Sequence, residues 1–163
     1  MAHFTDLSPC QYHSGPFDYS NWSCPLVAVG WLEHPNAFNS GEVPTHIAIK
    51  LRALAEQAGE AFPEIQFRGL HDCSLCAFKG DGTSSLSGSH INLFIPGHHQ
   101  VFVAPGRIDH YIEVHSYQPP FEFIDSVLSC PMPGSSEYRR RMTSVNGGSE
   151  SPLFFDQARP NAN

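Results

Sequence analysis

Two cysteines and two histidines carry the clearest metal-binding pattern in the sequence. Cys73 and Cys76 form a C-x2-C pair, and His110 and His115 follow as an H-x4-H pair. Close pairs of this kind bind zinc, because a short turn can direct two ligand atoms at one ion. Two thiolates also neutralise a divalent cation, so the filled site can be buried at a small electrostatic cost. The pattern predicts one tetracoordinate Zn2+ ion held by Cys73, Cys76, His110 and His115.

The spacing of the two histidines sets a condition on the helix that carries them. Five residues of a regular α-helix turn through roughly 500°, which leaves the imidazoles about 140° apart. We therefore expect the helix to be distorted at its end, where residues 116–120 offer a terminating sequence with two prolines. The alternative is that the two cysteines are ordinary buried thiols and the histidines only cap a helix.

Three further histidines could enlarge or change this site. His71 could replace a ligand, hydrogen-bond a sulfur from outside the coordination shell, or be exposed, and the last two options are favoured. His98 and His99 are adjacent, but neighbouring side chains in a strand or turn point apart, so we interpret them as surface residues.

Four good ligands also argue against a catalytic zinc, because catalysis needs an open coordination position for water. Asp109 and Glu113 could act as a general base only if one of the four ligands were misassigned. The sequence contains no P-loop, no H-E-x-x-H, no dinucleotide-binding glycine motif and no G-x-S-x-G. These absences favour a protein that is not an enzyme.

The elements that must position the ligands are short. Apolar runs and helical spacing predict a buried strand, a helix, a short strand, a β-hairpin and two later helices. Their ranges are 26–32, 44–57, 65–69, 90–103, 105–115 and 119–128, respectively. A cysteine knuckle, a hairpin and a helix in this order resemble an enlarged zinc-finger unit. The predicted fold is therefore a small zinc-stapled α+β domain with an additional N-terminal strand and helix.

The chain is expected to form one domain with a tail. Its 163 residues match the usual size of one domain, which we place at residues 1–142. Residues 143–163 are rich in Gly, Ser, Asn and Pro, which is typical of a flexible tail. Within the tail, Leu153, Phe154 and Phe155 could dock on the domain or on a partner, and docking on the domain is the simpler interpretation.

Charge and composition exclude several classes of partner. Nine basic and 16 acidic residues give a formal charge of −7, which repels a nucleic-acid backbone. The basic run at residues 139–141 is interpreted as a solvated helix end. The N-terminus lacks the pattern of a secretory signal, and no apolar run is long enough to span a membrane. With an odd count of five cysteines, these features predict a soluble cytoplasmic protein.

Several motifs resemble a family of small uncharacterised bacterial proteins classed only as a domain of unknown function. The resemblance rests on D-L-S-P at residues 6–9 with Tyr12, V-G-W-L at 29–32, G-L-H-D-C-S-L-C at 69–76, and the block at 101–128. In that family the H-x-C-x-x-C and H-Y-x3-H-x-Y-x-P-P segments recur together. The resemblance thus implies a shared metal site at His71, Cys73, Cys76, His110 and His115, without implying an activity.

These observations support three hypotheses for function. The first is a non-catalytic, zinc-stabilised intracellular bacterial protein that acts through protein–protein interaction, as an immunity or regulatory factor. The alternatives are a zinc-dependent hydrolase and a nucleic-acid-binding zinc finger. We favour the first, because the ligand set is closed, the chain is acidic and catalytic motifs are absent.

Overall fold

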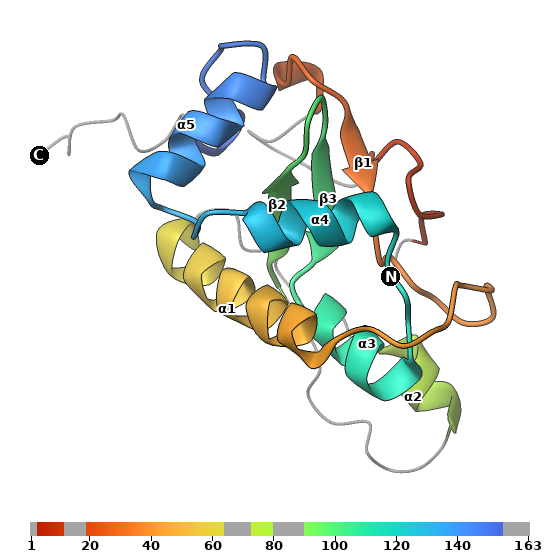
Figure 1. Ribbon diagram of the computed structural model, residues 1–163. Helices are drawn as coiled ribbons and strands as arrows, with labels where there is room; N and C mark the ends of the chain where they lie inside the picture. Colours follow the sequence, from red (N-terminus) through yellow and green to blue (C-terminus); the bar gives the residue numbers. More distant parts are fainter. Residues whose placement is uncertain (1–2, 12–18, 64–72, 80–89, 155–163) are drawn as a thin grey trace, which may run out of the picture.

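A computed structural model describes residues 3–11, 19–63, 73–79 and 90–154 of the chain. The described elements form a three-stranded sheet with five α-helices and two 3-10 helices around it (Figure 1). In chain order they are η2 (Tyr19–Asn21), β1 (Leu26–Ala28), α1 (Thr45–Ala61), α2 (Ser74–Lys79), β2 (Asn92–Pro96), β3 (Val101–Pro105), α3 (Ile108–His115), α4 (Phe121–Ser129), α5 (Ser136–Val145) and η4 (Pro152–Phe154).

The sheet forms the centre of the molecule, in the order β1-β3-β2. β2 and β3 form the antiparallel hairpin that the sequence predicts, with Phe94 opposite Val103, and β1 pairs with β3 in parallel. All strand residues except Pro105 are buried. Strands of a sheet buried on both faces have continuous apolar sequences, without alternation of apolar and polar residues, and the strands here follow this pattern.

The N-terminal segment covers the free edge of β1. Backbone hydrogen bonds join Cys10 N to Leu26 O at 2.8 Å and Ala28 N to Ser8 O at 2.9 Å, with an antiparallel bridge between Pro9 and Val27. An uncovered edge strand exposes unpaired backbone groups, and this segment pairs with them. The N-terminal arm is therefore part of the sheet architecture.

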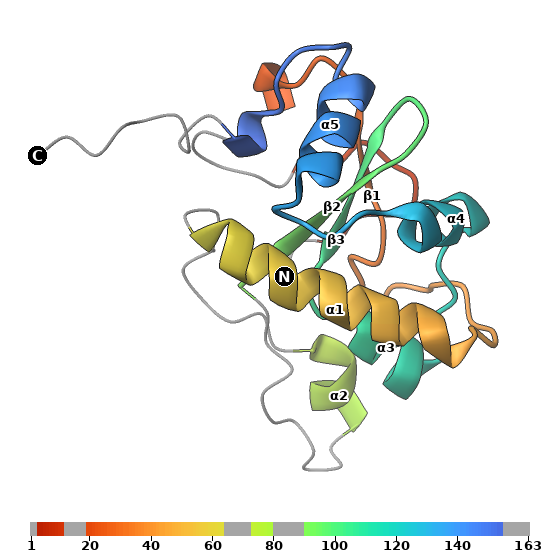
Figure 2. The ribbon, with the colours of Figure 1, turned by 60° about the vertical axis from the view of Figure 1, so that its left-hand side comes forward.

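Helices α1 and α4 contact each other and the β2 edge of the sheet (Figures 1 and 2). Ile47, Leu51, Leu54 and Ala58 recur at helical spacing along α1 and are buried, whereas Ile49 is exposed. Helices α2 and α3 lie together at one end of the molecule, and α5 lies at the other end in both views.

The α+β class predicted from the sequence is confirmed, but several boundaries differ. β1 ends at Ala28 because Gly30, at φ +75°, turns the chain away from the sheet. α1 runs through Gly59 to Ala61. A Cβ at position 59 would lie 2.7 Å from Ile91 Cδ1, so this glycine permits close packing and does not end the helix. The short strand expected at 65–69 lies outside the described residues.

Two more boundaries shift near the predicted metal-binding residues. Pro105 completes β3, and α3 begins only at Ile108. The cysteine segment, expected as a knuckle, forms the short helix α2, with Cys73 directly before it and Cys76 within it. The order of a cysteine element, a hairpin and a histidine helix is nonetheless the one the sequence predicts.

The C-terminal part contains a helix that the sequence patterns did not delimit. The basic run at residues 139–141, interpreted as a helix end, lies in the middle of it. α5 begins after Ser135, whose hydroxyl accepts a hydrogen bond from the Tyr138 N–H at 3.1 Å. Leu153 and Phe154 are buried, at 1% and 2% exposure, as docking on the domain would require. The packed part of the chain thus extends past residue 142 to Phe154. In the described ranges, no helix combines the length and the apolar character needed to cross a bilayer.

Candidate metal centre

Helix α3 presents both histidines, and its last turn is wider than that of a regular α-helix. The Ser116 N–H donates to Tyr111 O, five residues back instead of four, and the Tyr117 N–H donates to the same carbonyl at 3.1 Å. Ser116 adopts the left-handed conformation, with φ 55°. A wider turn rotates the chain less per residue, so His115 moves back toward the side of His110. This is the distortion that the H-x4-H spacing requires.

Helix α2 presents the two cysteines from the opposite side of the site. Its first turn is closed by a hydrogen bond from Ala77 N to Cys73 O at 3.1 Å. Ser74 Oγ accepts a hydrogen bond from the His34 N–H at 3.0 Å, which ties α2 to the loop after β1. Leu75 is buried, so the side of α2 that carries it faces the core.

The structure brings the four predicted side chains together. His115 Nε2 lies 3.3 Å from both Cys73 Sγ and Cys76 Sγ, and His110 Nε2 lies 3.3 Å from Cys76 Sγ. All four ligand atoms lie within 4.8 Å of one another. Zinc bond lengths of about 2.3 Å to sulfur and about 2.0 Å to nitrogen imply a sulfur–nitrogen separation of roughly 3.5 Å at tetrahedral angles. The cluster can therefore hold a metal ion.

The surroundings of the cluster favour a neutral His110 imidazole and low solvent access. Cys73, Cys76 and His115 are buried, and His110 is partly buried. Burial lowers the pKa of His110, and the positive charge of Arg107 lowers it further. A lowered pKa keeps the imidazole in the neutral form that binds metal ions. Burial, followed by the charges of Cys73 and Cys76, raises the pKa of Tyr111.

The two carboxylates next to the histidines are engaged by arginines. Arg52 of α1 donates through Nε to Asp109 Oδ2 at 2.9 Å and through Nη2 to Glu113 Oε2 at 2.7 Å. The other Asp109 oxygen lies 3.4 Å from Arg107 Nε. These pairs fix α3 against α1, and they occupy the groups that the sequence offered as general bases.

A second network holds the chain just beyond His115, and sequence reasoning assigned none of its residues a role. Tyr117 Oη donates to the Asp6 carboxylate, with both oxygens 2.9 Å away, and Asp6 Oδ1 also accepts from the Gly30 N–H at 2.9 Å. Burial and the Asp6 charge raise the pKa of Tyr117. Asp6 and Tyr117 lie in the family-like motifs, which was the only available signal.

The remaining histidine predictions fall outside the cluster. His98 and His99 are exposed at the hairpin turn, with ring centroids 6.5 Å apart, as expected for surface residues. His71 lies outside the described residues, so its predicted place beside the cysteines stays a prediction.

Comparisons with known proteins give one match. Residues 2–128 match the family described as Domain of unknown function (DUF7919). The match includes all four clustered side chains. No curated protein and no solved structure matches the chain.

Proposed function

The chain belongs to the DUF7919 family, and we propose that it is a non-catalytic domain stabilised by Zn2+ that acts by binding another protein. The observation that carries this proposal is the convergence of two sulfurs and two imidazole nitrogens within 4.8 Å, from two helices distant in sequence. We propose Cys73, Cys76, His110 and His115 as the four zinc ligands.

The donor set favours zinc over other common cations. Thiolate and imidazole are the ligands of structural zinc sites, whereas calcium and magnesium prefer oxygen. Two thiolates cancel the charge of a divalent ion and two neutral imidazoles add none, so the filled site can remain buried. A tetrahedral four-ligand site is also the usual geometry of structural zinc.

The same arrangement argues against the hydrolase alternative. Four protein ligands leave no position for a reactive water. Asp109 and Glu113 are paired with Arg52 and do not stand free as bases. A structural role follows more directly, because α2 has only six residues, too few for a helix that is stable alone. Zinc would bind this helix to α3.

Metal analysis and cobalt substitution test the zinc assignment. The purified protein should contain one zinc per chain by elemental analysis, and Co2+ in its place should give the intense visible bands of a tetrahedral thiolate site. Cys76→Ser and His115→Ala should abolish those bands. Cys24→Ser and His99→Ala are matched controls, because both residues lie away from the cluster, and they should retain them. Full metal content in Cys76→Ser would contradict the assignment.

The exposed face of α4 supports the protein-binding part of the proposal. Phe121 is 74% exposed and Leu128 is 49% exposed, with the half-buried Ile124 between them. Residues at this spacing share one side of a helix. Large exposed apolar side chains on one helix face are a feature of interaction surfaces.

Co-purification from the native host tests this surface. A stoichiometric partner recovered with the wild-type chain should be lost with the double variant Phe121→Ser/Leu128→Ser. The metal content should stay unchanged, because α4 carries no ligand. Recovery of the same partner with the double variant would reject α4 as the binding face.

A further inference from the structure

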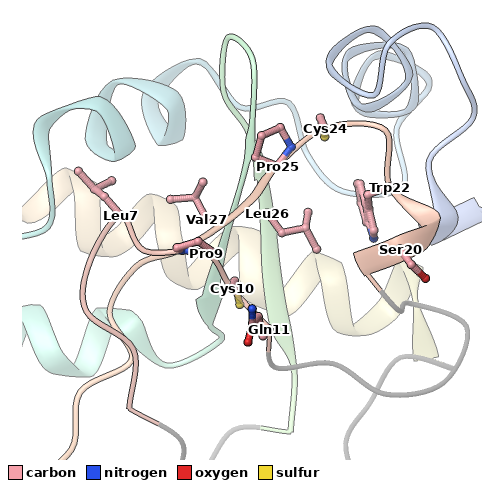
Figure 3. A pocket seen from close by; sticks show the side chains of 10 residues that line it. All are labelled: Leu7, Pro9, Cys10, Gln11, Ser20, Trp22, Cys24, Pro25, Leu26 and Val27. Atoms are coloured by element: carbon pink, nitrogen blue, oxygen red, sulfur yellow. The ribbon is translucent and has the colours of Figure 1, made fainter.

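A pocket distant from the metal centre opens between the N-terminal arm and β1 (Figure 3). Its volume is about 340 Å³, within the range of small-molecule sites. Among the described lining residues, none carries a formal charge at neutral pH and none belongs to the Cys/His cluster. The lining residues are Leu7, Pro9, Cys10, Gln11, Ser20, Trp22, Cys24, Pro25, Leu26 and Val27.

The pocket has a buried apolar floor and an exposed rim. Cys10, Trp22, Leu26 and Val27 are buried and form the floor. The rim residues include Gln11 and Ser20, which are exposed and polar. Burial raises the pKa of the half-buried Cys24 thiol, which keeps this group uncharged as well. The cavity therefore suits an uncharged, largely apolar occupant.

Trp22 supplies a polar group without a partner. The residue is 7% exposed, and its indole Nε1 is buried and makes no hydrogen bond with the described protein. In Figure 3 the nitrogen-bearing edge of the ring is turned toward the Ser20 end of the pocket. Buried N–H groups in proteins are nearly always paired, so this unpaired group on a side chain of the pocket wall indicates an acceptor supplied from elsewhere.

The other tryptophan, Trp31, differs from Trp22 in having a hydrogen-bond partner for its indole N–H. Trp31 is buried too, and its Nε1 donates to Val103 O at 2.9 Å. The orientation of Trp22 is also well fixed, because its ring stacks on Phe94 at 5.7 Å with planes 6° apart. The next residue, Ser23, donates its N–H to Asn146 Oδ1 at 2.7 Å. The unpaired N–H thus belongs to a side chain held in place by its neighbours.

From this geometry we propose that the pocket is a binding site for a small neutral molecule with an apolar body and one hydrogen-bond acceptor. The body contacts the floor formed by Cys10, Leu26 and Val27, and the acceptor receives the Trp22 Nε1–H. This site is independent of the proposed zinc site, whose ligands come from α2 and α3.

The two indole N–H groups allow a test in the intact protein. Acetophenone is the probe, and α-methylstyrene is its control, because the two differ by a carbonyl oxygen in place of a methylene group. In 1H–15N spectra, acetophenone should shift the Trp22 indole proton downfield in a saturable way and leave the Trp31 indole proton unchanged. α-Methylstyrene should bind roughly tenfold more weakly, because it leaves the N–H unpaired.

The variant Trp22→Phe keeps the apolar wall and removes the donor. It should bind the two compounds with similar affinity. Three outcomes would overturn the proposal: no Trp22 shift at saturating acetophenone, equal affinity of the wild type for both compounds, or a Trp22 indole proton that is already hydrogen-bonded and exchange-protected without probe. Because the indole signals are read in the wild type, the test does not depend on the variant folding.

Discussion

The α2 end and the α5 end of the molecule are attached to the same core by different chemistry. At the first end, six helical residues meet α3 through two sulfurs and two imidazoles. At the second, Phe62, Tyr138 and Phe154 form an aromatic group with centroids 5.7 to 6.4 Å apart. Tyr138 Oη also donates to Phe94 O of β2 at 2.7 Å.

This difference shows how a small domain can hold its peripheral helices. Aromatic side chains bury a large apolar area, which stabilises without any added ligand. The α2 segment contributes mainly Cys73, Leu75 and Cys76 to the core. Its attachment should therefore depend on the metal, whereas that of α5 should not.

The largest expected effect is that of metal removal. Structural zinc contributes on the order of 10 kcal/mol in small domains, so chelation should lower the melting temperature sharply. Hydrogen exchange should rise first at residues 73–79 and 108–117, with 136–154 protected for longer. His115→Ala should reproduce this pattern without a chelator. An equal rise of hydrogen exchange at both ends, or an unchanged melting temperature after complete metal removal, would contradict the expectation that only the α2 end depends on the metal.

Thiol labelling offers a second measurement of how metal removal opens the α2 end. Burial raises the pKa of Cys130 to about 12, so this thiol should stay unreactive with or without metal. Chelation should make Cys73 and Cys76 reactive.

Phe154→Ala should produce the next largest effect. Removing a fully buried phenylalanine costs about 3–5 kcal/mol, which urea unfolding would measure. The Arg139 guanidinium, 4.6 Å from the ring centroid of Phe154, would lose its cation–π contact as well. The zinc content and the cobalt spectrum should not change, because the ligands lie at the other end. Loss of metal in this variant would show that the two ends are coupled.

Tyr117→Phe should have a smaller effect that reaches the metal centre. The change removes the hydrogen bonds to Asp6 and should cost about 1–2 kcal/mol. Because the contact with Asp6 anchors the chain two residues after His115, its loss should weaken metal binding, which competition with a chelator would measure. Tyr138→Phe is the matched control, since it loses one buried hydrogen bond at the α5 end and should leave the metal affinity unchanged.

Phe121→Ser should have the smallest effect on stability. The side chain is 74% exposed, so the free energy of unfolding should change by less than about 0.5 kcal/mol. Thermal unfolding would detect a larger loss, which would place Phe121 in the core and remove it from the proposed binding face.

Local sequence patterns were sufficient for the elements with strong periodicity or spacing. The hairpin, α1 and α4 lie where apolar spacing and turn residues predict them. The ligand cluster was also accessible, because C-x2-C and H-x4-H are short-range patterns. The rotation per residue of a regular α-helix showed that the helix end must be distorted, and the structure has this distortion at Ser116.

The parts that were missed depend on contacts between distant segments. α5 buries only Tyr138 and Met142 in an otherwise polar helix, so its periodicity is weak. Its start could have been recognised, because Ser135 is a typical N-cap residue after the turn residues Pro133 and Gly134, and the acidic Glu137 follows in the first turn. No local pattern could join Asp6 to Tyr117, since that pair exists only once the sheet brings the N-terminal arm beside α3.

The hydrogen bonds that Tyr117 and Gly30 donate to the Asp6 carboxylate have a practical consequence. Trimming the first ten residues, a routine step before crystallisation, would remove this clamp and uncover the edge of β1. A shortened protein should then bind Zn2+ more weakly at the proposed site, although its four side chains are unchanged. Purification tags are therefore better attached after Asn163, and residues 1–10 are better left intact.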